Sequence, residues 1–240
     1  MTSFITKRQI SSLLCFLMPT ILIFSRQKLI DHAFTGWDTH DLSFVNFVYF
    51  RDCLASGHIP LWNPFIQSGT FFPSFFQIGF FSPFEFSFAL LALILPPLPV
   101  YEWMIQFVVL MGGIGGYVFF RSIDVDHDLS CLGATILTIT TLVINIGQIW
   151  FIFALGALPW MLAIAHAIVE GKWRLSAYPV FGIIFGFAYA CGYPWMNLVN
   201  TVLFASYTGY IFLSAKRAHM VNSRSKCNAR SEDLVWCSES

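Results

Sequence analysis

The side chains best suited to chemistry gather early in the chain, in the run Gly36-Trp37-Asp38-Thr39-His40-Asp41. Asp38 and Asp41 are three residues apart, so both carboxylates can present to one side, with His40 between them, if the chain turns into a helix here. A carboxylate within hydrogen-bond reach of a hydroxyl can act as a general base. The same two acids can instead satisfy the start of a helix, as N-cap and first-turn acid. The local sequence leaves both interpretations open.

An apolar segment, Leu42–Ala55, separates this run from a second polar one. Leu42–Phe50 is apolar almost all round, which predicts a helix that lies in the membrane interface with its aromatic side chains in lipid. Arg51 sits on the same helix, where it can meet a phosphate or extend to lipid headgroups. Gly57 predicts the end of the helix, because glycine readily adopts the left-handed conformation found there.

The second polar run is Pro60-Leu61-Trp62-Asn63-Pro64-Phe65. Its two prolines restrict the backbone, Trp62 suits the headgroup level of a bilayer, and the Asn63 amide offers both a donor and an acceptor. This combination has no simple structural explanation, so it is a candidate binding segment.

The composition indicates where these segments must be placed. Of 240 residues, 57% are hydrophobic and 11% are charged, whereas soluble domains carry about 25% charged residues. The sequence therefore predicts an all-α integral membrane protein. Its formal net charge of zero gives no global field that would attract nucleic acid.

Runs of about 20 apolar residues are long enough to cross a bilayer as helices. Several of the runs found here also carry small residues at packing spacing, notably Gly112-Gly113-Ile114-Gly115-Gly116. The sequence predicts about six transmembrane helices: Ile10–Phe24, Val100–Phe120, Leu129–Ile149, Phe151–Val169, Ala177–Cys191 and Met196–Ala215.

These spans divide the chain into four regions: an anchor helix (1–30), a long extracytoplasmic loop with interfacial helices (31–99), a five-helix bundle (100–215) and a disordered tail (216–240). Within the loop, Phe84–Leu95 is too short to span and ends in two prolines, which predicts an interfacial or re-entrant helix. Lys and Arg flanking the spans place both termini in the cytoplasm. The chain is therefore expected to be a multi-pass membrane protein.

The other polar residues are weaker candidates. Asp124–Asp128 lacks the glycine and the final glutamate of a calcium loop and predicts a solvated turn before the next span. His166 is expected to be packed or to reach the interface. Glu85 and Glu102 lie at the edges of apolar runs, which places both at the outer interface, although acids within a membrane are functional by default.

The order of acid, interfacial helix with an arginine, Ser-Gly and Pro-Leu-Trp-Asn-Pro resembles the first outer loop of YfhO-like bacterial membrane proteins, which are placed among the C-type integral-membrane glycosyltransferases. The likeness is strong over Gly36–Pro83, including Gly69 and Phe81-Ser82-Pro83. It continues weakly through Arg121 and Gly192-Tyr193-Pro194, where the family usually has Gly-His-Pro-Gln. Similar enzymes are considerably longer, so this chain looks like their N-terminal module.

The resemblance implies transfer of a sugar from a polyprenyl-phosphate donor to an extracytoplasmic acceptor, with Asp38 as the general base. Asp41 is a second catalytic candidate that can also hold a divalent metal or orient His40. No other cofactor is implied, and membrane lipid is the expected partner. The residues assigned to substrate binding are His40, Arg51, Trp62, Asn63, Gln67 and Tyr193.

Two other functions remain open. The glycine-rich run and the proline-broken helices are also typical of a transporter or flippase-like bundle. The missing length and the altered Gly192-Tyr193-Pro194 motif favour a non-catalytic membrane subunit or an inactive fragment.

Overall fold

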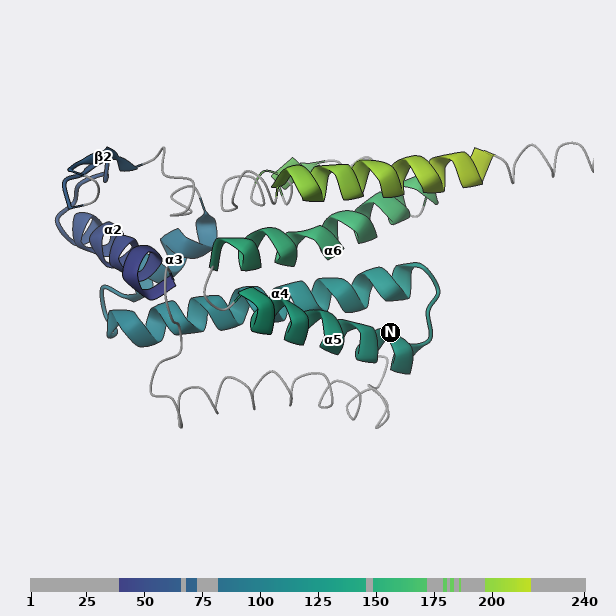
Figure 1. Cartoon of the computed structure of the whole chain (residues 1–240), viewed down its shortest axis with the longest axis horizontal. Helices are drawn as coiled ribbons and strands as arrows, with labels where there is room; N and C mark the ends of the chain where they lie inside the picture. The colour runs from purple at the N-terminus through teal and green to yellow at the C-terminus, as the bar shows by residue number, and fades with distance from the viewer. Residues whose placement is uncertain are drawn as a thin grey trace, which may run out of the picture.

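The computed structural model describes residues 39–65, 68–72, 82–145, 149–171, 179–180, 182–183, 186 and 197–216. This part of the chain is mostly helical (Figure 1). The anchor Ile10–Phe24, most of Ala177–Cys191 and the tail 217–240 lie outside the described residues. The elements in chain order are η2 (Thr39–Phe44), α2 (Val45–Ala55), β1 (Trp62–Asn63), β2 (Thr70–Phe71), α3 (Pro83–Leu91), α4 (Pro97–Ser122), α5 (His127–Asn145) and α6 (Ile149–Val169), followed by a peripheral helix, Asn197–Lys216.

Helix α4 packs against both α5 and α6, and glycines bring the helices close together. A Cβ added to Gly112 would lie 2.9 Å from the Cα of Gly156 on α6, and a Cβ on Gly115 would lie 2.6 Å from the Trp160 ring. The Trp160 indole N–H donates to the Met111 carbonyl at 2.8 Å. The glycine-rich run of α4 is therefore used for helix packing, and it gives no support to a transporter.

In the described part of the chain, two helices are long and apolar enough to cross a membrane, α4 and the peripheral helix Asn197–Lys216. In the most apolar window of α4, 44% of the residues are buried within the protein, against 11% for the peripheral helix. An apolar helix that is this exposed is unlike the core helix of a soluble domain, because its side chains, among them Phe212 and Leu213, are left uncovered. A bilayer would cover them.

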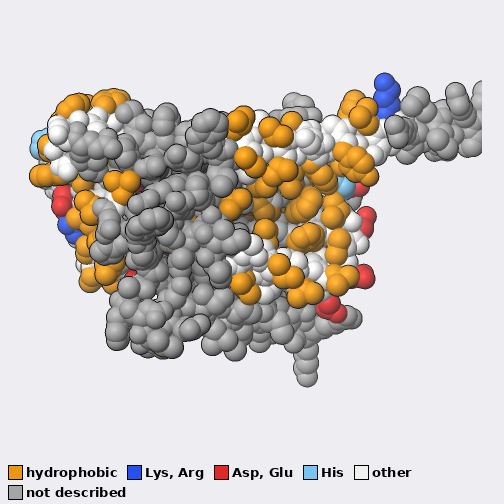
Figure 2. All heavy atoms as spheres, in the orientation of Figure 1, with side chains coloured by type: hydrophobic (Ala, Val, Ile, Leu, Met, Phe, Trp, Pro, Cys, Tyr) orange, Lys and Arg blue, Asp and Glu red, His pale blue; other side chains and the backbone are white. Residues whose placement is uncertain are grey.

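Helices α4, α5 and α6 alternate in direction, and the peripheral helix runs in the same direction as α6 (Figure 1). Figure 1 shows that α4, α6 and the peripheral helix end at the same end of the bundle, where α5 begins. Arg121 lies in the last turn of α4 and Lys216 ends the peripheral helix, so both basic residues lie there. Figure 2 shows charged side chains at the two ends of the visible face, and the described side chains next to the right-hand end are mainly hydrophobic.

At the opposite end, η2, α2, β1, β2 and α3 form a small unit, here called the cap, next to the start of α4 (Figure 1). The cap and α4 share one hydrophobic core, in which Phe47, Phe50 and Phe72 pack with Tyr101 and Met104. Phe47 and Phe50 are 0% and 2% exposed. The aromatic side chains of this helix were expected to lie in lipid. For Phe47 and Phe50 this expectation is wrong, because residues of α4 cover both rings.

The predicted helix end before Gly57 is confirmed, while an interfacial or re-entrant position for α3 stays a prediction. Helix α2 ends at Ala55, and Gly57 follows with φ +71°. Helix α3 has nine residues and begins after Ser82, whose hydroxyl accepts from the Glu85 N–H. It is too short to span a bilayer, since a span needs about 20 residues.

Candidate functional site

The acidic run enters the cap through an unusual helix. Residues Thr39–Phe44 form a π-helix that continues directly into α2, and π-helical turns are rare and frequent at functional sites. His40 and Asp41 are part of η2, but the positions of their side chains are not described. Asp38, the predicted general base, directly precedes η2 and lies outside the described residues. Both interpretations of the acids, as catalytic groups and as helix caps, therefore remain predictions.

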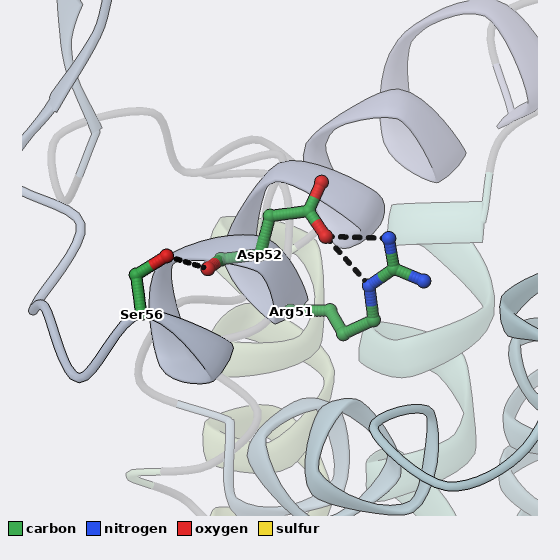
Figure 3. A network of polar contacts seen from close by, with 3 residues as sticks. All are labelled: Arg51, Asp52 and Ser56. Carbon is green, nitrogen blue, oxygen red and sulfur yellow. Dashed lines mark hydrogen bonds and ion pairs between the residues drawn. The ribbon is translucent and has the colours of Figure 1, made fainter.

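Arg51 lies on α2 and forms an ion pair with the next residue (Figure 3). Its Nε and Nη2 donate to Asp52 Oδ1 at 2.8 and 2.5 Å. The side chains of Arg51 and Asp52 are 23% and 57% exposed, so the pair is close to solvent and weak. An anion that reaches the cap can compete with Asp52 for the guanidinium. The sequence analysis missed Asp52, although it adjoins the only arginine of this helix.

Asn63 is buried and serves the cap itself. Its Nδ2 donates to Asn46 Oδ1 at 3.0 Å, and its Oδ1 accepts from the Phe65 N–H at 3.0 Å. Asn46 Nδ2 in turn donates to the Leu42 carbonyl at 2.9 Å. With 1% of its surface exposed, Asn63 ties β1 to α2. The sequence analysis did not identify Asn46 as the partner of Asn63. Its only sign in the sequence is that it is a single amide side chain within an apolar helix.

Trp62 is 57% exposed and lies across Gly69. A Cβ on Gly69 would come within 2.6 Å of the indole ring, and Gly69 has φ +106°. The strand pair β1–β2 joins Trp62 to Phe71, while the Tyr49 hydroxyl donates to the Trp62 carbonyl at 2.6 Å. The backbone of Trp62 is thus held by the strand pair and by Tyr49, and its indole ring packs on the backbone of Gly69. An exposed indole is typical of side chains at a membrane surface.

Tyr49 remains a hydrogen-bond donor over the physiological pH range. Burial, with smaller contributions from the Cys53 side chain, raises the pKa of its hydroxyl to about 12. The ring also packs against Phe72 and Phe65, with centroid distances of 5.3 and 6.0 Å. Tyr49 therefore holds α2 and the strand pair together both through its hydroxyl and through its ring.

Glu85 and Glu102, expected at the outer interface, are buried within the protein, 5% and 7% exposed. Burial raises the pKa of the Glu85 carboxyl well above its ordinary value of 4.5, because a charged carboxylate loses its hydration there. The sequence did not predict that Glu85 is a buried acid with a raised pKa.

Two histidines form polar clusters at the other end of the bundle. His166 lies between the Tyr207 hydroxyl, 3.0 Å from Nδ1, and Glu170 Oε1, 3.1 Å from Nε2. These contacts confirm that His166 is packed, and they connect α6 to the peripheral helix. The contact with Glu170 could be predicted from the sequence, because the two residues are four positions apart on one helix. The contact with Tyr207 could not, because the two residues are 41 positions apart.

The second histidine, His127, begins α5. Its Nδ1 lies 3.0 Å from the Tyr117 hydroxyl, and its Nε2 lies 3.9 Å from Cys131 Sγ. The preceding residues confirm the predicted turn, in which Asp124 has φ +60°. Arg121 Nη1 closes this turn by donating to the Val125 carbonyl at 2.7 Å.

The described residues contain no group of three or more His, Cys, Asp and Glu side chains that could hold a metal ion. Asp41, the predicted metal ligand, has no described side-chain position. Gln67 and Tyr193, assigned to substrate binding, lie outside the described residues. Of the predicted site residues, the structure describes the side chains of Arg51, Trp62 and Asn63.

The chain matches no family model, no curated protein and no solved structure. Its likeness to YfhO-like proteins therefore rests on the sequence motifs. What the described residues offer chemically is an aromatic-rich cap at one end of an apolar bundle, with one partly exposed guanidinium, that of Arg51. Such a cap suits an amphiphilic ligand that has an apolar tail and an anionic head.

Proposed function

We propose that this chain is a membrane glycosyltransferase of the C type, or the N-terminal module of one, which uses a polyprenyl-phosphate sugar as donor. In this proposal the chain has six spans, both termini are cytoplasmic, and the cap lies on the extracytoplasmic side of a bacterial inner membrane. The observation that carries the proposal is the start of a rigid helix immediately after Asp38, at the end of the bundle opposite Arg121 and Lys216.

The orientation supports the proposal because basic residues are retained on the cytoplasmic side. An end that carries Arg121 and Lys216 would face the cytoplasm, and the cap would then face the opposite compartment. A lipid-linked donor can reach the cap from the side, where the outward faces of the helices are apolar (Figure 2). The exposed Trp62 would lie at the headgroup level.

The proposed reaction uses Asp38 as the base. The acceptor hydroxyl gives its proton to the Asp38 carboxylate, and its oxygen forms a bond to the anomeric carbon of the sugar. The bond from that carbon to the phosphate oxygen breaks, and polyprenyl phosphate leaves with the electron pair. Asp41 is the residue that would hold a divalent metal if one is bound.

Arg51 is the described residue best placed to meet the donor phosphate. It lies six positions after Val45, where α2 begins, which corresponds to about 9 Å at 1.5 Å per residue. The six residues of η2 separate Val45 from Asp38. We therefore expect Arg51 to contribute to donor binding more than to the chemical step.

The experiment that tests the proposal is sugar transfer by the full chain in liposomes that contain polyprenyl-phosphate sugars. Asp38→Asn should abolish transfer while membrane insertion and the thermal unfolding profile stay unchanged. Arg51→Gln should raise the KM for the donor with a smaller effect on kcat, and His58→Gln, an exposed cap residue, serves as the matched control. Unchanged transfer by Asp38→Asn would remove the proposal.

A further inference from the structure

Glu85 occupies an unusual position between the cap and α4. It is the third residue of α3, after Ser82 and Pro83, in a Ser-x-x-Glu pattern that usually forms a reciprocal capping box. The Ser82 hydroxyl accepts from the Glu85 N–H at 3.3 Å. The return bond, from the Ser82 N–H to the Glu85 carboxyl, is not among the hydrogen bonds of the described residues. The carboxyl is therefore not used to cap the helix.

Within the described part of the chain, no buried positive charge accompanies Glu85. Of the described residues that are buried, none is a lysine or an arginine. Helix α3 packs on α2 and on α4, and the titratable group that faces Glu85 from α4 is the Tyr101 hydroxyl. Asn46 on α2 already bonds Leu42 and Asn63. A charged carboxylate here would be desolvated and unpaired.

A buried acid of this kind is stable when it is neutral, since an unpaired ionised carboxylate in an apolar site costs many times more than a hydrogen-bonded carboxylic acid. Its pKa is accordingly raised by burial. Ionisation at moderate pH requires that water reaches the carboxyl. In this fold water can reach it when α3 moves away from α4.

We propose that Glu85 is a proton-binding site that couples the docking of the cap on α4 to proton uptake. When the cap is docked, the carboxylate takes one proton from the aqueous phase on the cap side and becomes a neutral acid. When the cap lifts, the carboxyl is hydrated and releases that proton. This site does not depend on the glycosyltransferase proposal, because it needs no sugar and no Asp38.

The contact that must open is an aromatic one. Phe84 and Phe88 of α3 pack on Phe107 of α4, with ring centroids 5.5 and 5.9 Å apart. Both rings of α3 lie within one turn of Glu85 along the helix. Movement that exposes the carboxyl must therefore separate these rings, and their separation reports on the docking of the cap.

The first test measures the protonation of Glu85 directly, in the full chain in liposomes. An apolar carbodiimide reacts with protonated carboxyls in apolar surroundings, and mass spectrometry locates the adduct. At pH 7 we expect Glu85 to be labelled and the exposed Asp52, 57% exposed, to remain unlabelled. Glu85→Gln should lose the adduct on this peptide. Absence of label on Glu85 at pH 7 would overturn the proposal.

The second test measures docking. Phe84→Cys and Phe107→Cys are combined, and cross-linking by a short bifunctional thiol reagent is followed from pH 5 to pH 9 with Glu85 and with Glu85→Gln. The ratio of the two yields cancels the ionisation of the thiols. We expect cross-linking to fall with rising pH, by several-fold relative to Glu85→Gln. A ratio that does not change with pH would overturn the coupling even if Glu85 is protonated.

Discussion

Single side chains of the cap show that polar groups stabilise this part of the chain mainly when they are buried and paired. Asn46 and Asn63 share one buried hydrogen bond of 3.0 Å, and Tyr49 donates to the Trp62 carbonyl. Each of these bonds joins α2 to the strand pair. Arg51 and Asp52 differ, because their ion pair is exposed and contributes little to stability.

Replacement of Asn63 by alanine should destabilise the cap by about 1–3 kcal/mol, because Asn46 Oδ1 and the Phe65 N–H lose a buried partner. The measurement is amide hydrogen exchange of the cap peptides in detergent, which should become faster in α2 and β1. His58→Ala, at an exposed position of the same unit, should leave the exchange unchanged. Equal protection in both variants would show that the amide pair contributes no stability.

The stability of the chain should depend on pH through Glu85. Its pKa in the folded state is raised above the ordinary 4.5, so the folded state binds the proton more tightly than the unfolded state. The contribution of Glu85 to the free energy of unfolding is fully present below pH 4.5. It is lost as the pH rises through the pKa of the folded state. Glu85→Gln, which is always neutral, should remove this loss. Thermal unfolding of both proteins at several pH values measures the difference, and parallel pH profiles would contradict it.

The sequence identified part of the residue-level picture. Arg51 stands out as a charge on an apolar helix, and Trp62 and Asn63 stand out between two prolines. The burial of Asn63 and Glu85 was not predictable, because it depends on partners from other elements. Asn46 precedes Asn63 by 17 positions, and Tyr101 reaches Glu85 from the next helix.

At the scale of elements, features that depend on neighbouring residues were predictable from the sequence, and features that depend on contacts between distant elements were not. The end of α2 before Gly57 was predictable because it depends on one glycine with φ +71°. The environment of the aromatic side chains of α2 was not, since an apolar helix can bury its rings in lipid or in protein with similar gain. The shared core with α4 decided between them.

The strand pair β1–β2 should depend strongly on Gly69. Gly69→Ala combines a φ of +106° with a Cβ only 2.6 Å from the Trp62 ring, so the indole must move. We expect a loss of several kcal/mol in the local stability of the cap, on the order of that caused by strain and overpacking together. Gly57→Ala is the matched control, because its φ of +71° is similar but the space around it is open. Tryptophan fluorescence and proteolysis of the cap measure the two variants.

At the scale of the whole molecule, the sequence predicted the long apolar helices, while the number of spans and their orientation stay predictions. Hydropathy located α4 and the peripheral helix, and both are long enough to cross a bilayer. The glycine-rich run of α4 was predicted to allow close packing, and its neighbours α5 and α6 are the elements that use it. The partners of the peripheral helix, Phe119 and His166, could not be predicted because they lie far away along the chain.

The two ends of the bundle should face opposite sides of the membrane. A cysteine introduced by His58→Cys in the cap should react with an impermeant maleimide added to intact cells. One introduced by Lys216→Cys, at the end of the peripheral helix, should react only after permeabilisation, in a background without the native cysteines. Labelling of both positions from the same side would rule out the proposed orientation.

The π-helix at the entrance to α2 has a consequence for how this segment tolerates the loss of a residue. A π-turn is an α-helical turn widened by one residue, so deletion of one residue from 39–44 would allow the ordinary ladder to close. Each residue of an α-helix turns the chain by about 100°. A single-codon loss within 39–44 would therefore be absorbed by loss of the widened turn, whereas a loss within α2 would turn one part of that helix by about 100° relative to the other and pull its buried face apart. The position of a gap in an alignment of this segment would matter more than its length.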